Sequence, residues 1–311
     1  MKKWIIIVCL FLLVIATILY FLIPANKNIG YRVMVNCTES GASRKIINKE
    51  NWQLWWPGQK KNDTLYTYQS RTYRIDKILL NGIQTTIFNN KDSVKAVLQV
   101  LFYGNDSTQF QWAFNNIEYS ANPIKRFEKY FEIKMFKENV VLLLADMKKY
   151  FDNPENIYGL KITTQKEAEA SMISLKNTFQ HYPSTQEIYG MIQSVKGYIQ
   201  KKGGEESGHP MLHVENEGLG IFEVMVAVPT KKDLPSEAQF ELKHMHLGFI
   251  LTADVKGGAY SVVKGEEELT NYFRDYKKNS PAISFQSLVT DRLTETDSTK
   301  WVTRLYYPVF Q

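Results

Sequence analysis

Apolar and polar residues alternate in short runs, separated by turn residues, between residues 31 and 134 of the chain. Because successive side chains of a strand point to opposite faces, this alternation predicts strands with one buried face. We expect a mostly antiparallel sheet here, with strands at residues 31–35, 66–77, 82–89, 107–114 and 131–133.

The pattern changes at residue 135, where apolar residues begin to recur at the spacing of a helix. These residues are Phe136, Val140, Leu143, Leu144, Met147 and Phe151. The segment Asp152-Asn153-Pro154-Glu155 breaks the pattern. We therefore expect one long helix over residues 135–151, followed by a linker over residues 153–161.

Helices and strands alternate in the remainder of the chain. The predicted helices cover residues 185–202 and 262–278, and Ser184 and Glu187 form a capping box at the start of the first. Strands are expected at residues 172–179, 211–215, 222–228, 240–246, 249–255, 285–292 and 301–309. The order strand-helix-strand-strand thus occurs twice, which suggests two similar halves whose sheets curve around a shared cleft.

The first residues have a third pattern. After Lys2 and Lys3, residues 4–23 contain no charge, and a helix of twenty residues spans roughly 30 Å, the thickness of a bilayer's hydrocarbon core. This predicts a single-pass membrane anchor with its N-terminus in the cytoplasm and the rest of the chain outside the cytoplasm, in the periplasm of a bacterial-type cell. A cleaved signal peptide is the alternative, but Ile23 is not the small residue expected two positions before a cleavage at Ala25.

Composition and charge exclude several classes of protein. A chain of 311 residues with 44% hydrophobic residues is long enough for two cores, which excludes a mainly disordered protein. The net charge is +6, but the lysine pairs are scattered along the chain, so we expect no nucleic-acid partner. The two cysteines, Cys9 and Cys37, do not make a disulfide framework.

Metal and cofactor motifs are also missing from the sequence. Four histidines fall on two predicted strands, namely His209, His213, His244 and His246. They could in principle hold zinc, but no Cys-x-x-Cys or His-Glu-x-x-His spacing accompanies them. We therefore expect neither a metal nor a cofactor.

Residues 160–311 resemble the GyrI-like effector-binding domain, which occurs in small-molecule-binding proteins and drug-responsive transcription regulators. The segments that carry the resemblance are PSTQEIYGMI, GHPMLHV, VMVAVP, VKGGAYSVV and WVTRLYYPVF. The resemblance implies a small-molecule ligand. No helix-turn-helix precedes this part of the chain, so direct control of transcription is not expected.

Residues 30–152 resemble, on fewer residues, the SRPBCC or START-like helix-grip superfamily. The segment NWQLWWPG and the long helix after a run of strands carry this resemblance. It implies an apolar cavity between helix and sheet, although Trp52, Trp55 and Trp56 are expected mainly to pack in the core. The predicted fold is therefore α+β, with an anchor over residues 1–25, a helix-grip domain over 30–152 and a duplicated effector-binding domain over 160–311.

Candidate ligand-binding residues follow from the last predicted strand. Period-two alternation places Arg304 and Tyr306 on one face. Similar domains often carry a glutamate two positions before this tyrosine, where it pairs with cationic drugs. An arginine there would favour an anionic ligand, because guanidinium binds planar anions through paired hydrogen bonds. The alternative is that Arg304 points to solvent or pairs with a structural carboxylate such as Asp291.

The other candidates are Tyr189, Tyr260, Glu223 and Asp291. The resemblance places Tyr189 and Tyr260 along the cleft, where each would offer an aromatic face and one hydroxyl, although both could equally be core residues. Glu223 and Asp291 are the carboxylates that a hydrolase acting in this cleft would use. Three functions remain open: binding of a small amphipathic, aromatic or anionic molecule without catalysis, which we favour, hydrolysis of a small electrophile, and an interaction protein with filled cores.

Overall fold

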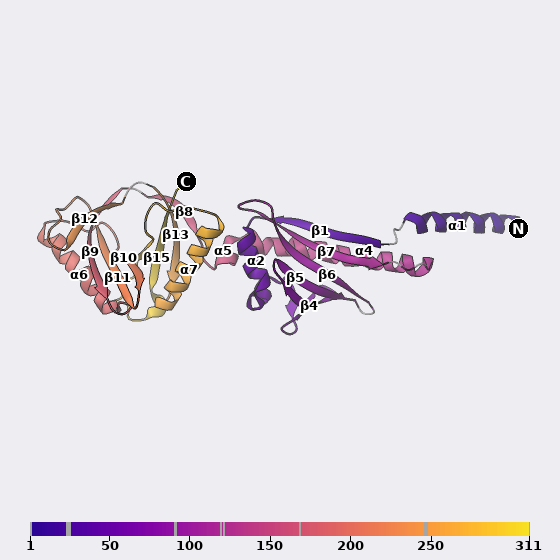
Figure 1. Ribbon diagram of the computed structural model, residues 1–311, viewed down its shortest axis with the longest axis horizontal. Helices are drawn as coiled ribbons and strands as arrows, with labels where there is room; N and C mark the ends of the chain where they lie inside the picture. The colour runs from indigo at the N-terminus through magenta and orange to yellow at the C-terminus, as the bar shows by residue number, and fades with distance from the viewer. Residues whose placement is uncertain are drawn as a thin grey trace. The chain divides into compact units, whose positions relative to one another are not determined.

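Two compact units make up the chain, Met1–Asn153 and Pro154–Gln311. The computed structural model describes residues 2–22, 26–89, 92–118, 120, 122–167, 169–245 and 248–310. Each unit contains helices and an antiparallel sheet of its own, so the predicted α+β class is confirmed (Figure 1).

The predicted membrane anchor is contradicted. The first helix, α1, covers Lys2–Leu22, and within the described part of the chain no helix is both long enough and apolar enough to cross a lipid bilayer. The predicted single-pass location, with both domains in the periplasm, is therefore wrong. The prediction rested on the length of the uncharged run at residues 4–23. Ile23 and Ala25 lie outside the described residues.

A seven-stranded antiparallel sheet forms the frame of the first unit, in the order β1-β7-β6-β5-β4-β3-β2. Strands that follow each other in the chain pair with each other from β2 to β7, and β1 pairs with β7. The bounds are β1 (Asn26–Val35), β2 (Gln59–Lys60), β3 (Leu65–Tyr68), β4 (Arg71–Leu79), β5 (Gly82–Phe88), β6 (Ser93–Phe102) and β7 (Thr108–Glu118).

One long helix, α4 (Pro123–Phe151), packs against this sheet (Figure 1). The Asn122 side chain caps it by accepting hydrogen bonds from the backbone N–H groups of Ile124 and Lys125. The helix thus begins well before residue 135, and the strand predicted at residues 131–133 is wrong. The buried residues at helical spacing are Ile133, Phe136, Val140, Leu143, Leu144, Met147 and Phe151.

Three tryptophans fill the core near two short helices, α2 (Glu39–Ile47) and α3 (Trp52–Trp55). Trp52, Trp55 and Trp56 are almost completely buried. Each indole N–H donates to a backbone carbonyl, so burial leaves none of these three donors unsatisfied. The predicted packing role of these residues is confirmed. A 3₁₀ turn (Lys49–Asn51) links the two helices.

An eight-stranded antiparallel sheet forms the frame of the second unit, in the order β12-β9-β11-β10-β14-β15-β13-β8. The bounds are β8 (Thr163–Glu167), β9 (Ala170–Phe179), β10 (Met211–Gly218), β11 (Ile221–Thr230), β12 (Phe240–Met245), β13 (Gly248–Lys256), β14 (Phe285–Leu288) and β15 (Val302–Val309). A short helix, α5 (Pro154–Tyr158), precedes them, and a 3₁₀ turn (Ser298–Lys300) precedes β15.

Each half of this sheet carries one helix on the same face. Helix α6 (Thr185–Lys201) packs against β9 and β11, and its predicted capping box of Ser184 and Glu187 is confirmed. Helix α7 (Ala259–Asp275) packs against β13 and β15. The side chains between sheet and helix form two separate apolar cores, one under each helix.

Chain connectivity rolls the second sheet into a partly closed barrel. Strands β8 and β9 are six places apart in the sheet order, which in a flat sheet corresponds to about 29 Å. Glu167 at the end of β8 is only three residues from Ala170 at the start of β9, a stretch that reaches at most about 11 Å. The two edges of the sheet must therefore approach each other, and the face without helices becomes concave (Figure 1).

Glu266 on α7 is a partly buried carboxyl whose ionisation opposes folding. Burial raises its pKa above the ordinary value of 4.5, although Gln286 Nε2 donates a hydrogen bond to it at 3.0 Å. The folded protein therefore binds this proton more tightly than the unfolded chain, so stability falls as the pH rises through and above 4.5. We expect Glu266→Gln to gain stability relative to the unmodified protein between pH 4 and pH 7. Urea unfolding across this range tests it, and a difference independent of pH would contradict it.

Candidate functional site

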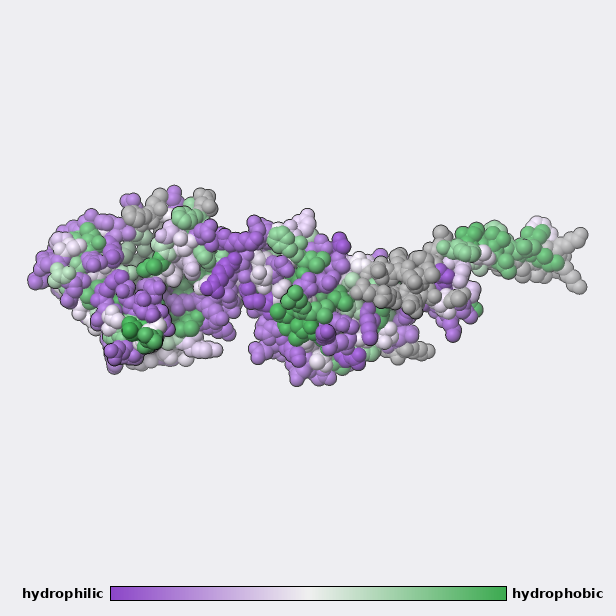
Figure 2. All heavy atoms as spheres, in the orientation of Figure 1, coloured by the Kyte–Doolittle hydropathy of each residue, from purple (hydrophilic) through white to green (hydrophobic). Residues whose placement is uncertain are grey.

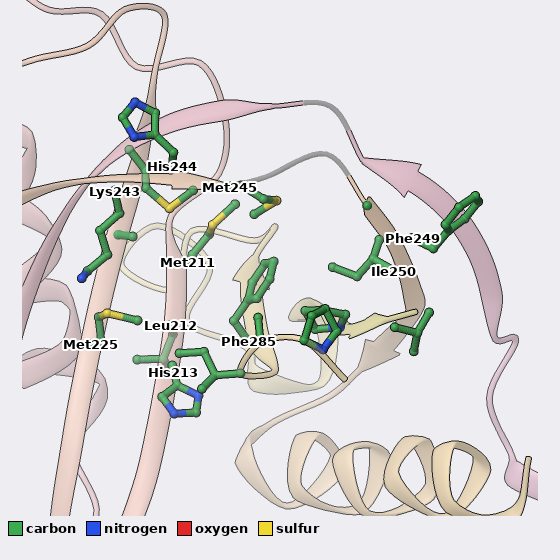
Figure 3. Close-up of a pocket in the computed structure, with 18 of the residues that line it drawn as sticks. Met211, Leu212, His213, Met225, Lys243, His244, Met245, Phe249, Ile250 and Phe285 are labelled. Atoms are coloured by element: carbon green, nitrogen blue, oxygen red, sulfur yellow. The ribbon is translucent and has the colours of Figure 1, made fainter. Parts of the chain in front are cut away.

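A cleft of about 650 Å³ lies on the concave face of the second sheet (Figure 3). On β11, Val224, Val226 and Val228 face the core under α6, so the alternate residues Met225 and Ala227 face the cleft. The lining residues are Lys166, Met172, Met211, Leu212, His213, Met225, Ala227, Lys243, His244, Met245, Gly248, Phe249, Ile250, Pro281, Ala282, Ile283, Phe285, Pro308, Val309 and Phe310.

The cleft opens where the two halves of the sheet are joined least. Strands β10 and β14 pair through only two positions, Met211 with Ser287 and Leu212 with Gln286. Beyond this short seam the halves separate, and each supplies one wall. Figure 3 shows Met225 on one wall, Ile250 on the other, and Met211 and Phe285 between them.

Most of the lining is apolar and deformable. Four methionines contribute to it, namely Met172, Met211, Met225 and Met245. An unbranched thioether side chain adapts to the shape of a bound molecule and makes favourable contacts with aromatic rings. Hydrophilic residues cover much of the visible outer face of this unit (Figure 2).

The ionisable lining residues are all basic: Lys166, His213, Lys243 and His244, with no carboxylate among the described residues that line the cleft. Three of them have acidic neighbours outside the lining, one of which is Glu215 beside His213. Lys243 Nζ lies 3.0 Å from Glu241, and His244 Nε2 lies 3.1 Å from Asp233. Lys166 makes no ion pair or hydrogen bond with the described residues and is the cation most available to a ligand.

One ring nitrogen of His213 is hydrogen-bonded to another described residue, and the other ring nitrogen is not. Its Nδ1–H donates to the backbone oxygen of Ser284 at 2.7 Å, which fixes the orientation of the ring. Nε2 is enclosed and makes no hydrogen bond within the described structure, and Glu215 Oε2 is 3.6 Å away. This nitrogen accepts a hydrogen bond when the ring is neutral and donates one when the ring is charged.

Tyr306 and Arg304 occupy the cleft-facing side of β15, since Leu305 between them belongs to the core under α7. The Tyr306 ring stacks on Phe285 with a centroid distance of 4.8 Å, and Phe285 lines the cleft. Arg304 forms two hydrogen bonds with Asp254, at 2.6 and 2.9 Å, which hold the pKa of Asp254 below its ordinary value. The carboxylate partner anticipated as an alternative is therefore Asp254 and not Asp291.

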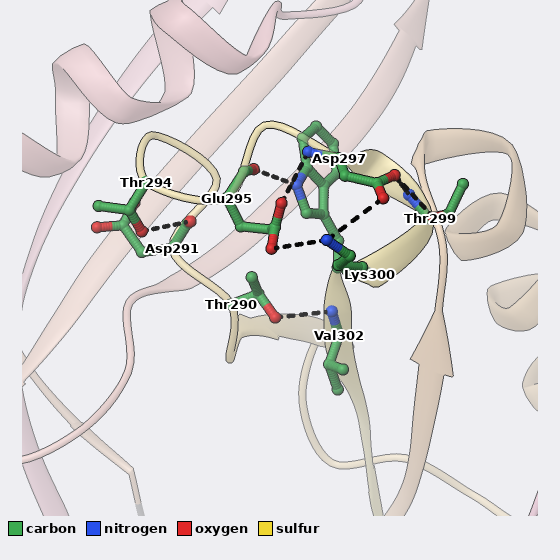
Figure 4. Close-up of polar contacts among 9 residues, drawn as sticks. Thr290, Asp291, Thr294, Glu295, Asp297, Thr299, Lys300 and Val302 are labelled. Carbon is green, nitrogen blue, oxygen red and sulfur yellow. Dashed lines mark hydrogen bonds and ion pairs between the residues drawn. The ribbon is translucent and has the colours of Figure 1, made fainter.

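Tyr189 and Asp291 lie together, but not in this cleft. They line a separate cavity of about 240 Å³ beside α6. The buried Tyr189 hydroxyl accepts from the backbone N–H of Arg292 at 2.8 Å, and burial raises its pKa. Asp291 Oδ1 accepts from the N–H of Leu293, and its backbone oxygen accepts from Thr294, so it organises a loop (Figure 4).

The remaining candidates are outside both cavities. Tyr260 on α7 is 83% exposed, and Glu223 on β11 is paired with Lys176 at 2.7 Å. Glu223 and Asp291 are therefore not brought together, and a hydrolase mechanism that uses both has no shared site. Among the described residues no group of His, Cys, Asp or Glu side chains is placed to hold a metal, and His246 lies outside the described residues.

Sequence reasoning missed most of the cleft. Met211, His213, Met225, Phe285 and Lys166 were not candidates, although all five line it. A signal was present for one of them, because Met225 lies between valines whose period-two spacing marks the opposite face as core. Lys166 and Phe285 come from strands far apart in the sequence, and only the rolled sheet brings them together.

No family model matches the chain, and no curated protein matches it either. Several solved structures are similar. The C-terminal domain of EcmrR matches at 14% identity and a TM-score of 0.43, over 49% of this chain and 98% of that domain. SAV2435 bound to tetraphenylphosphonium matches at 20% identity and a TM-score of 0.35, over 48% of this chain and 93% of that protein. A hydrolase from Listeria innocua matches at 12% identity and a TM-score of 0.38, over 48% and 91%.

All three TM-scores are below 0.5, so we take no ligand or activity from these structures. What the second unit binds is argued below from its own cleft.

Proposed function

We propose that the second unit is a receptor for a small, mainly apolar molecule that carries a negative charge, and that it binds this molecule without transforming it. The observation that carries the proposal is the cleft of about 650 Å³, with its methionine and phenylalanine walls and its exclusively basic ionisable lining residues. Volumes of this size accommodate ligands of drug size.

The apolar walls supply affinity and the basic groups supply selectivity. Burying apolar ligand surface contributes roughly 25 cal/mol per Å². A cation bound in the same place would meet Lys166 and Lys243 without a compensating carboxylate in the lining. The enclosed Nε2 of His213 adds one polar contact that orients the ligand. In fold terms, the proposal assigns residues 160–311 to the GyrI-like class and residues 30–152 to the helix-grip class.

Titration of the full chain with 8-anilinonaphthalene-1-sulfonate, an aromatic anion whose fluorescence rises in apolar surroundings, tests the proposal. We expect saturable binding at one site, and weaker binding of a cationic dye of similar size. Absence of saturable binding, or preference for the cation, would reject the proposed ligand class.

Lys166→Ala is expected to weaken binding of this probe about two- to tenfold, because the lysine is exposed and its charge acts partly through solvent. The matched control is Lys264→Ala, which removes an exposed lysine of α7 that does not line the cleft. Both dissociation constants are read from the same fluorescence titration. Equal effects of the two substitutions would show that only the net charge matters.

A further inference from the structure

Arg71 in the first unit is a buried cation without an anionic partner among the residues that the structure describes. It is the first residue of β4, its side chain is 6% exposed, and its guanidinium lies 4.5 Å from the centre of the Phe136 ring on α4. Its Nη1 atom is enclosed and donates no hydrogen bond, and Arg71 forms no ion pair with any residue that the structure describes. Guanidinium stays charged at every physiological pH, so this charge cannot be removed by losing a proton.

The polar groups around Arg71 are already engaged with one another. The Tyr73 hydroxyl donates to Asn139 Oδ1, and Asn139 Nδ2 donates to Gln69 Oε1 at 3.1 Å. Glu132, one helical turn before Phe136 on α4, is bound to Lys129 at 2.9 Å. Glu132 Oε1 is enclosed and makes no hydrogen bond to Arg71. No described residue therefore accepts a hydrogen bond from the enclosed Nη1 of this guanidinium.

We propose that the first unit binds a small carboxylic acid, with its carboxylate paired to Arg71. A buried charge is costly unless an opposite charge and hydrogen bonds compensate it, and a carboxylate provides both. The planar fork of guanidinium matches the two oxygens of a carboxylate. Phe136 covers one face of the guanidinium, which leaves its edge for this in-plane contact.

A second unused donor supports a ligand with acceptor atoms in this core. The indole Nε1 of Trp112 is completely enclosed and has no acceptor among the described residues. The Trp112 ring is 5.8 Å from the ring of Tyr73, two residues after Arg71 on β4. An aromatic ring thus lies beside the second donor, which favours an acid with an aromatic or alkyl body.

Paired probes test this site in the full chain. Benzoate and octanoate are compared with benzamide and octanamide, which have the same bodies without the charge, by thermal shift and calorimetry. We expect the two acids to raise the melting temperature and the amides to leave it unchanged. Arg71→Met is expected to weaken binding of the acids at least tenfold, whereas Arg74→Met, which changes an arginine of the same strand that is paired with Asp76, keeps it.

Three results would overturn the proposal. The first is that neither acid shifts the melting temperature, and the second is that Arg71→Met binds them as well as the unmodified chain. The third is that the acids bind only to the Glu132→Gln variant, which would show that the Glu132 carboxylate is already paired with Arg71 in the unmodified chain. If Arg71→Met does not fold, Arg71→Lys keeps the charge and removes the paired geometry, and it should also weaken binding. Lys166→Ala distinguishes binding at Arg71 from binding in the cleft of the second unit, because this substitution should leave the affinity of the acids for the Arg71 site unchanged.

Discussion

Gly82→Ala is expected to destabilise the first unit by about 3 kcal/mol or more. Gly82 is buried at the start of β5, and a Cβ atom built on it would lie 2.0 Å from the backbone oxygen of Leu98 on β6. That oxygen belongs to the backbone and cannot rotate away as a side chain can. Relief requires β5 and β6 to separate in the middle of the sheet, where their hydrogen-bonded ladder would be lost.

The matched control for this prediction is Gly30→Ala in β1 of the same sheet, where an added Cβ would meet only the Gln111 side chain at 3.8 Å. This substitution should be neutral or slightly stabilising, because alanine loses less backbone entropy than glycine. For a unit of about 150 residues, 3 kcal/mol corresponds to a drop of roughly 10 °C in melting temperature. Scanning calorimetry of both variants measures it, and equal melting temperatures would contradict the proposed clash.

Ala227→Trp is expected to weaken binding of the anionic dye about thirtyfold, or roughly 2 kcal/mol. Ala227 is 5% exposed and faces the cleft from β11. An indole there would occupy space that the dye needs, between the wall that carries Met225 and the wall that carries Ile250. The concave face has room for the larger side chain, so the fold should persist while the ligand is excluded.

Val263→Trp is the control, because Val263 on α7 is 51% exposed and does not line the cleft. It adds the same indole to the same unit and should leave dye affinity unchanged. The far-ultraviolet circular dichroism of both variants must match that of the unmodified chain. Unchanged affinity in Ala227→Trp would place the dye somewhere other than the cleft, and the proposed receptor function would lose its basis.

Local signals explain which elements the sequence predicts well. Helix α6 was predicted nearly residue for residue, because Ser184 and Glu187 cap its start and Gly203 follows its end with a positive φ of 67°. Residues 131–133 alternate as a strand would, but three residues are too few to distinguish a strand from one turn of helix. Strand β6 was missed because Val97 and Leu101 make its partly exposed face apolar as well, which blurs the alternation.

The site depends on tertiary contacts that one sequence does not reveal. Tyr189 was proposed for the cleft, but its hydroxyl donates a hydrogen bond to the backbone oxygen of Thr290 and accepts one from the backbone N–H of Arg292. Both residues are about a hundred positions away in the chain. For Arg304 the sequence leaves open an anionic ligand or a structural carboxylate such as Asp291, and strand register places Asp254 directly opposite. Register fixes such partners, and a single sequence does not determine register.

Because the seam between β10 and β14 is short, the residues of the two cleft walls can change independently of each other during evolution. Each wall rests on its own helix, and the strand ladder that joins them has only two paired positions. Met225 belongs to the wall that rests on α6 and Ile250 to the wall that rests on α7, and both side chains face the cleft and not a core. New ligand preferences can therefore be acquired by altering one wall at a time, without repacking the other.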